Sequence, residues 1–422
     1  MQLPRTWTIR ALAVGILVFA VGCAGAPSHD PLVLPLHSRG TPSPTYIRQL
    51  SCSVMDTTAI ALAWLDDSPE GSRIWTCRVA YDPGHGFRAS SLPTLVDKGV
   101  IQDVAVVSGD NAIGLLYTKN NQLLFSWPLS ETPIPLTTRR IEGVISSTAT
   151  IAPDGSLIAA ALLVQMHGTE RSTVELVAYR INDRVHAVPL ARVQLAPTNT
   201  SQGPPLIRVV ADGFEISQMI TVGKTLRLWS GTDSLQSLIG NSGELLILRL
   251  RNDLTIQEVT RRPLPDDDDI AFAHCFALVD SAMTTIVAGK PRIKVIPLTT
   301  PGRPTRISSA VGTGSGFAIP SVQSLALSDT SALVAWVDTD RAFSGVSMVE
   351  GASDPTAKGG DIHARVVTRT GTVASDLVPG FPIATHAQCI LLGTIQKQAF
   401  LVWAGPGETQ LRIELLPTNA NH

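Results

Sequence analysis

Apolar and polar residues alternate in short runs along most of the chain, and Gly, Pro, Asn or Asp residues separate these runs. Residues 59–66, 112–118, 331–338 and 399–403 form short, mainly apolar runs, each of which contains β-branched and aromatic side chains. Alternation with a period of two is typical of β-strands, and no segment shows a sustained helical period. The pattern therefore predicts an all-β protein.

The strand signals group into seven similar units. Their second strands share an apolar run that ends in an aromatic residue, as in Ala-Leu-Ala-Trp64, Leu-Val-Ala-Trp336 and Phe-Leu-Val-Trp403. In the fourth unit we expect separate strands at 214–221, 225–229 and 244–250. The units cover residues 47–96, 103–137, 145–195, 206–260, 272–308, 321–385 and 389–416.

Repeated units of about 40–65 residues, each with about four short strands, match the blades of a β-propeller. We therefore predict a seven-bladed propeller over residues 46–418. Six or eight blades remain alternatives, and a pair of β-sandwiches is the competing architecture.

Two units resemble known propeller repeats. The sixth resembles a repeat of secreted bacterial β-propellers through Trp336, Asp338, Asp361, Ile362, Arg365, Gly371 and Pro382. The third contains Ile-Ala-Pro-Asp-Gly-Ser156, which is similar to a turn in the propeller of the translocation protein TolB. These resemblances imply the fold and carry no active site.

The N-terminus resembles the signal of a bacterial lipoprotein. Arg5 and Arg10 precede the apolar run 11–21, which is too short to span a bilayer. The sequence Ala20-Val21-Gly22-Cys23 then resembles a lipobox, with Ala where Leu is usual. The resemblance implies that residues 1–22 are removed, that Cys23 carries palmitate-type acyl chains, and that the protein sits in the cell envelope. Because Ala24 is not Asp, the expected membrane is the outer one. A secretory signal with an incidental Cys is the alternative.

Residues 23–45 are rich in Pro, Ser and Gly and are expected to form a tether. One apolar island interrupts them at residues 31–36, Pro-Leu-Val-Leu-Pro-Leu. The last unit lacks a fourth strand, and proteins usually avoid an exposed apolar sheet edge. We therefore predict that residues 31–36 pair antiparallel with 411–416 and hold the ring close to the membrane.

The composition supports a large core and argues against nucleic-acid binding. Hydrophobic residues make up 44% of the 422 residues and charged residues only 16%. The formal charge is −2, and loss of the two arginines in residues 1–22 makes it −4. A weakly acidic chain with scattered bases does not suit nucleic acid. The expected partners are the membrane, through lipid on Cys23, and an envelope protein or glycan, and we expect a monomer.

Four cysteines remain beside Cys23, and their spacing with histidine suits no zinc motif. Cys52 and Cys389 fall in the first strands of the first and last units, which become neighbours in a closed ring. They can form a disulfide in an exported protein. The other interpretation is that all four, with Cys77 and Cys275, are buried thiols.

No motif indicates catalysis, a cofactor or a metal. The acidic run 266–269 lacks the alternating oxygens of a calcium loop and is expected to be a solvated loop. A glycan hydrolase would need two converging carboxyl groups. Asp56, Asp103 and Asp280 lie near suitable strand ends, but the sequence pairs none of them.

An insertion at residues 341–358 interrupts the sixth unit and contains Phe343, Val346 and Met348. Loops on a rigid scaffold often carry binding residues. We therefore expect a partner-binding loop here, with a tolerated insertion as the alternative. The sequence as a whole predicts a lipid-anchored, non-catalytic binding or scaffolding propeller. The alternative is a propeller enzyme that acts on envelope or extracellular glycans.

Overall fold

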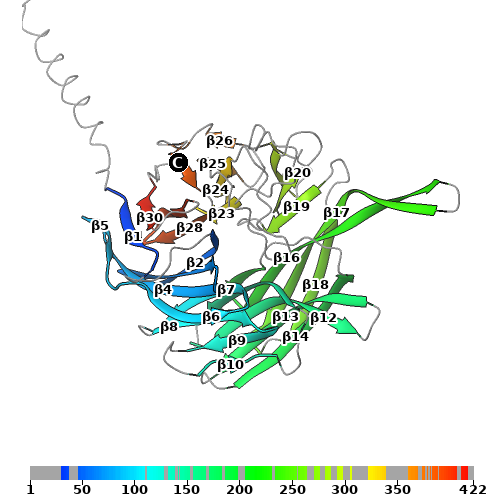
Figure 1. The fold of residues 1–422 in the computed structure, drawn as a ribbon, viewed down its shortest axis with the longest axis horizontal. Helices are drawn as coiled ribbons and strands as arrows, with labels where there is room; N and C mark the ends of the chain where they lie inside the picture. Colours follow the sequence, from blue (N-terminus) through cyan, green and yellow to red (C-terminus); the bar gives the residue numbers. More distant parts are fainter. Residues whose placement is uncertain are drawn as a thin grey trace, which may run out of the picture.

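The computed structural model describes the predicted ring of strands and a short segment that precedes it (Figure 1). The signal peptide, Cys23, the insertion at 341–358 and residues 266–269 lie outside the described residues, as do Asp280 and Phe343, Val346 and Met348. The described residues are 30–37, 46–109, 112–127, 132–137, 141, 143–152, 155–167, 171–182, 186–197, 205–230, 233–253, 255–263, 270–275, 281–286, 292–297, 305–306, 322–338, 360–368, 373–375, 378, 381, 383–387, 389–405 and 410–416.

The described strands form seven antiparallel sheets of four or five strands, and each predicted unit corresponds to one sheet. We number the sheets by unit. Sheet one contains β2 (Tyr46–Asp56), β3 (Ala59–Ser68), β4 (Gly71–Asp82), β5 (Gly86–Ala89) and β6 (Thr94–Gly99). Sheet two contains β7 (Ile101–Gly109), β8 (Ala112–Lys119), β9 (Gln122–Ser126) and β10 (Ile134–Pro135). Sheet three contains β11 (Gly143–Ile151), β12 (Leu157–His167), β13 (Arg171–Asn182) and β14 (His186–Pro197).

The remaining sheets complete the ring. Sheet four contains β15 (Leu206–Val210), β16 (Gly213–Ser230), β17 (Asp233–Arg251) and β18 (Ile256–Pro263). Sheet five contains β19 (Ile270–Cys275), β20 (Ser281–Ile286), β21 (Arg292–Pro297) and β22 (Thr305–Arg306). Sheet six contains β23 (Val322–Ala326), β24 (Ser331–Asp338), β25 (Gly360–Thr368), β26 (Val373–Ser375) and β27 (Ile383–Ala387). Sheet seven contains β28 (Cys389–Ile395), β29 (Gln398–Ala404), β30 (Gln410–Leu415) and β1 (Leu32–Pro35).

Neighbouring sheets meet chiefly through their first strands: β2 contacts both β7 and β28, β7 contacts β11, and β28 contacts β23. Sheets five and six share a buried cluster that includes Val295 and Trp336. This arrangement is a β-propeller, as the repeated units predicted. Within the described residues no helix is both long and apolar enough to cross a membrane.

Burial on both faces explains the apolar second strands. Along β3, Leu62 and Trp64 face the cluster shared with sheet seven, whereas Ala63 and Leu65 face the cluster shared with sheet two. A strand that is covered on both sides has no solvent face, so its sequence is continuously apolar. This is why the Ala-Leu-Ala-Trp type of run recurs.

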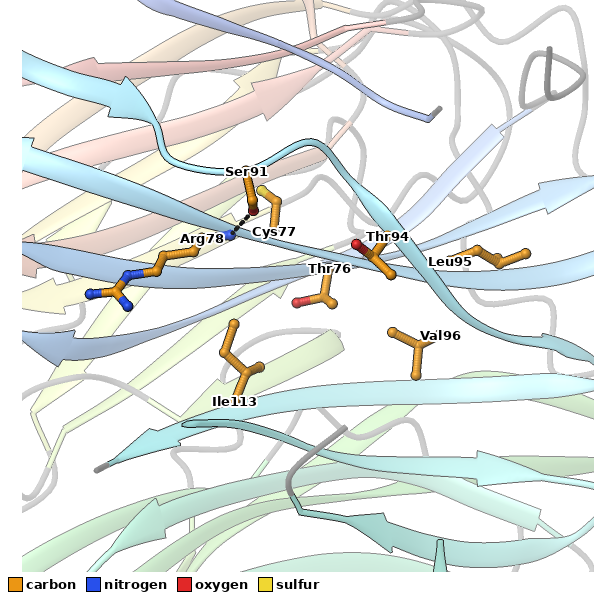
Figure 2. A pocket seen from close by; sticks show the side chains of 8 residues that line it. All are labelled: Thr76, Cys77, Arg78, Ser91, Thr94, Leu95, Val96 and Ile113. Carbon is orange, nitrogen blue, oxygen red and sulfur yellow. Dashed lines mark hydrogen bonds between the residues drawn. The ribbon is translucent and has the colours of Figure 1, made fainter. Parts of the chain in front are cut away.

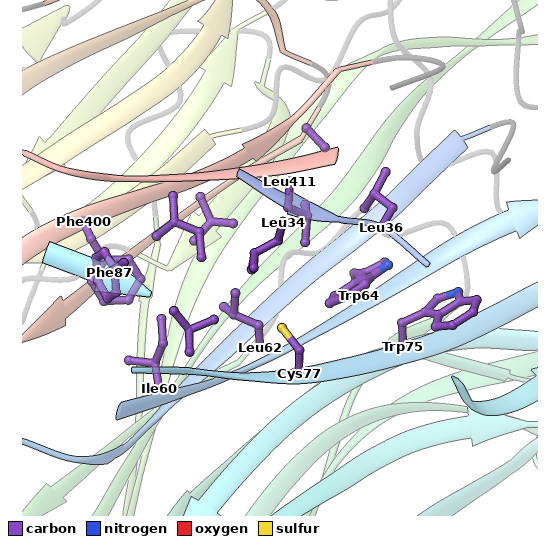
Figure 3. Packing of buried hydrophobic residues seen from close by; sticks show 14 of the residues in the cluster. Leu34, Leu36, Ile60, Leu62, Trp64, Trp75, Cys77, Phe87, Phe400 and Leu411 are labelled. Carbon is purple, nitrogen blue, oxygen red and sulfur yellow. The ribbon is translucent and has the colours of Figure 1, made fainter. Parts of the chain in front are cut away.

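Residues 31–36 close the ring as predicted. β1 pairs antiparallel with β30, with Leu32 opposite Ile413 and Pro35 opposite Gln410. Leu34 and Leu36 are buried in the cluster between sheets seven and one, where they lie near Trp64 and Trp75 (Figure 3). The outer strand of the last sheet therefore comes from the opposite end of the chain.

Sheet four differs from the prediction. Residues 225–229 do not form a separate strand, because β16 continues through them and pairs with β17 from Gly213–Arg251 to Ser230–Asp233. Neither β15 nor β18 accompanies the outer part of this hairpin. The outer part projects well beyond the other strands in Figure 1. We call residues 221–230 and 233–243 the ribbon.

Candidate functional site

Polar side chains join the first strands of sheets one and two. The Nε2 atom of Gln49 donates hydrogen bonds to Asp103 Oδ1 at 2.8 Å and to the Val104 carbonyl at 2.9 Å. Further along, the amide of Val106 donates to Ser51 Oγ at 2.9 Å. The pairs Gln49–Val104, Ser51–Val106 and Ser53–Ser108 all keep an offset of 55 residues, so β2 and β7 run in the same direction and in register.

Asp103 lies at the junction of three sheets. Its Oδ1 atom accepts from Gln49 of β2, and its Oδ2 atom accepts from the hydroxyl of Ser147 on β11. The side chain is 3% exposed. A register shift between Ile101 and Val104 places Asp103 at an irregularity within β7, and β-bulges of this kind redirect side chains. We call Gln49, Asp103 and Ser147 the junction cluster.

Burial raises the pKa of the Asp103 carboxyl above its usual range, and the hydrogen bonds from Ser147 and Gln49 oppose this shift. A buried carboxylate without partners would be very costly, so these bonds are needed for the side chain to stay in the interior. Both carboxylate oxygens are therefore committed to joining sheets. This role fits a structural residue.

Arg48 extends the polar region at the same end of the ring. Its Nη2 atom lies 3.7 Å from Asp67 Oδ1 and donates to Ser72 Oγ at 3.2 Å and to the Ile101 carbonyl. Ser72 donates in turn to Asp67 Oδ1 at 2.7 Å. Arg48 thus links β3, β4 and β7.

Asp56 and Asp103, two of the three acids considered from the sequence, do not converge. Asp103 accepts a hydrogen bond from Gln49 of β2, which is seven residues before Asp56. Seven residues of strand span about 23 Å. Carboxyl pairs in glycoside hydrolases are about 5–9.5 Å apart. Asp56 instead accepts from the backbone and hydroxyl of Thr58 in a turn, and these bonds lower its pKa.

A buried ion pair lies between sheets one and seven. Arg73 donates through Nε to Asp66 Oδ1 at 2.7 Å and through Nη2 to Oδ2 at 3.2 Å, and both side chains are at most 5% exposed. The Arg73 guanidinium also lies 5.7 Å from the centroid of the Trp75 ring. His37, directly after the closing strand, is 6.2 Å from the same ring. This group was not predicted from the sequence, although Asp66 and Asp67, followed by Arg73 across a short turn, indicated it.

Burial shifts the pKa values of this group in opposite directions. It raises the pKa of Asp66, against the effect of the Arg73 charge. It lowers the pKa of His37, and Arg73 adds to that shift. Burial and the Arg73 charge thus favour the neutral form of His37. The Asp66–Arg73 pair is a structural link beneath the closing strand.

A small cavity of about 260 Å³ lies between the outer strands of sheet one and Ile113 of sheet two (Figure 2). It forms where the fourth strand is broken, since β5 pairs with residues 79–82 of β4 and β6 with residues 72–76. The Arg78 amide donates to Ser91 Oγ beside it at 3.1 Å. Ligand pockets are usually about 300–1,000 Å³ with several convergent polar groups. This cavity does not fit that description.

The structure does not contain the Cys52–Cys389 disulfide that the sequence suggested. Both cysteines are free, as is Cys77. β2 and β28 are neighbours as expected, but the Cys389 thiol interacts with the backbone of Leu50, two residues before Cys52. Two residues correspond to about 6.6 Å along a strand, which accounts for the missing bond. Burial raises the pKa of each thiol to about 12, so none is a nucleophile at pH 7.

Metal binding has no support in the described parts of the chain, where no three His, Cys, Asp or Glu side chains come together. The predicted lipidation at Cys23 and the predicted binding loop fall outside these parts.

The comparisons with known proteins concern the fold. No protein-family model and no curated protein matches the chain. Among solved structures it is similar to a protein of unknown function from Dyadobacter fermentans, with 11% identity and a TM-score of 0.43 over 92% of this chain and 100% of that one. It is also similar to an α-L-arabinanase of Penicillium chrysogenum complexed with arabinobiose, with 10% identity and a TM-score of 0.44 over 92% and 98% of the two chains.

A sialidase of Trypanosoma rangeli is a third such structure, with 9% identity and a TM-score of 0.44. The match covers 92% of this chain and 60% of the sialidase chain. At these identities the similarities assign no activity to this chain.

Proposed function

We propose that this protein is a lipid-anchored, non-catalytic binding or scaffolding propeller of the bacterial cell envelope. The anchor rests on the lipobox-like sequence that ends at Cys23. The non-catalytic role rests on the junction cluster, because the buried Asp103 carboxylate is used to hold three sheets of the ring together.

The ribbon supports a binding role. A two-stranded hairpin of this length is only marginally stable alone in water, and its outer edges carry backbone groups that a partner strand can pair with. Addition of an extended segment to such an edge is a common mode of peptide recognition. The expected ligand is therefore an extended segment of an envelope protein.

The membrane anchor is tested by Cys23→Ala in the full-length chain, expressed in a bacterium with lipoprotein processing. Detergent phase partitioning should place the wild type in the detergent phase and the variant in the aqueous phase. A variant that stays in the detergent phase would rule out lipid on Cys23 as the anchor. Ala24→Ser, which leaves the acceptor Cys intact, serves as the control.

The non-catalytic role is tested with purified protein incubated with envelope polysaccharides, by measuring newly formed reducing ends. No release above background is expected. Release that disappears in Asp103→Asn, while thermal unfolding of that variant stays cooperative, would contradict the proposal and favour a glycan hydrolase.

A further inference from the structure

The ring has two distinct faces because its first strands run in one direction. The offset of 55 residues shows this for β2 and β7. Gln396, in the turn after β28, donates to the Thr57 carbonyl, in the turn after β2, at 2.6 Å. Arg180, near the end of β13, donates to the carbonyl of Asn252, which follows β17. We call the end where the first strands begin the N-terminal face and the opposite end the C-terminal face.

The closing strand fixes where the N-terminal segment leaves the ring. β28, β29 and β30 alternate in direction, so β30 begins at the N-terminal face, as β28 does. β1 is antiparallel to β30 and places Pro35 opposite Gln410, the first residue of β30. Going backwards from Leu32, the chain therefore heads toward the C-terminal face.

The segment between the closing strand and the lipobox-like Cys is short. Cys23 and Asp30 are seven residues apart, which limits their separation to about 25 Å even when the chain is fully extended. A lipid on Cys23 would thus hold the C-terminal edge of sheet seven close to the bilayer surface.

The ribbon lies at the opposite face. β15 begins at the N-terminal face and β16 is antiparallel to it, so β16 runs toward the N-terminal face and the ribbon extends from there.

We infer that the C-terminal face of the ring lies against the lipid bilayer, and that the N-terminal face, with the ribbon and the junction cluster, points away from it. The inference rests on the proposed lipid anchor and adds the orientation that the anchor imposes. A protein partner of the envelope would then reach the ribbon without competing with the membrane surface.

The orientation can be measured with two probes in the same sheet. Thr57 lies in the turn before β3 at the C-terminal face, and Glu70 lies in the turn after β3 at the N-terminal face; both are exposed. β3 has ten residues, which separates the probes by about 33 Å. One position at a time is replaced by p-azidophenylalanine (Thr57→p-azidophenylalanine or Glu70→p-azidophenylalanine), and a donor dye is attached to it. The lipidated full-length protein is then reconstituted in phosphatidylethanolamine–phosphatidylglycerol vesicles whose head groups carry an acceptor dye.

The expected result is severalfold higher energy transfer from position 57 than from position 70. Equal transfer, or higher transfer from position 70, with the protein still floating with the vesicles would overturn the orientation and leave the lipid anchor intact. Wild-type protein that does not float with the vesicles would overturn the anchor and the orientation together. Insertion of a long Gly-Ser segment after Ser28 should abolish the difference, and a difference that persists would overturn the short tether as its cause.

Discussion

The closing strand offers the sharpest test of how the ring is held together. Leu34 is 1% exposed and packs in the cluster between sheets seven and one, opposite Leu411 (Figure 3). Leu34→Ala removes three carbon atoms, which is worth about 2.4 kcal/mol of burial at about 0.8 kcal/mol each. The cavity that remains raises the expected loss to about 2–5 kcal/mol. Val33, next along β1, points outward and is 45% exposed, so Val33→Ala is the matched control and should cost below about 1 kcal/mol.

The assay is guanidinium unfolding of residues 23–422 with Cys23→Ala, followed by tryptophan fluorescence, since Trp64 and Trp75 lie in the same cluster. Midpoints convert to free energies through a common slope if that slope is unchanged. Leu34→Ala should lower the midpoint clearly more than Val33→Ala. If the two variants differ by less than about 0.5 kcal/mol, β1 does not contribute to the stability of the ring, and the argument from burial fails.

Three further predictions concern buried polar groups. Arg73→Met should lower the free energy of unfolding by about 3–5 kcal/mol, because it leaves the Asp66 charge buried and unpaired. Adding Asp66→Leu to this variant should recover much of the lost stability, as measured by thermal unfolding. An equal loss in the single and the double variant would contradict this reasoning. Because the pKa of Asp103 is raised on folding, the folded state binds the carboxyl proton more tightly than the unfolded state does. The stability that this proton contributes is complete below about pH 3.9, the ordinary pKa of Asp, and is lost as the pH rises through the pKa of the folded state. The stability of Asp103→Asn relative to the wild type should therefore increase from acid toward neutral pH, and a constant difference would refute the shift. Cys77 and Cys389, whose pKa values are about 12, should react with iodoacetamide at pH 8 only after denaturation, as mass spectrometry would show.

The local pattern was sufficient for most of the strands and for their grouping into sheets. Short apolar runs and turn residues predicted seven units, and each unit forms one sheet in the structure. The runs are informative because a strand covered on both faces must be apolar, and the turn residues because a turn needs compatible backbone angles. Asn120 and Asn121, at φ of 51° and 61°, form the tight turn that their type indicates. Gln396 and Lys397 adopt the same conformation without such a signal, because the strands on either side impose it.

The sequence determined the closing strand as well, since residues 31–36 were the one apolar stretch left for an incomplete last sheet, and β1 occupies that edge. The sequence did not determine where β16 ends, because alternation shows that a segment is a strand but not how many residues the strand has before the chain turns back. Nor did it show that Gln49, Asp103 and Ser147 meet, since these residues lie on three sheets and are far apart in the chain. Only the parallel alignment of the first strands in the ring brings them together, and the same alignment separates Asp56 from Asp103 and gives the ring its two different faces.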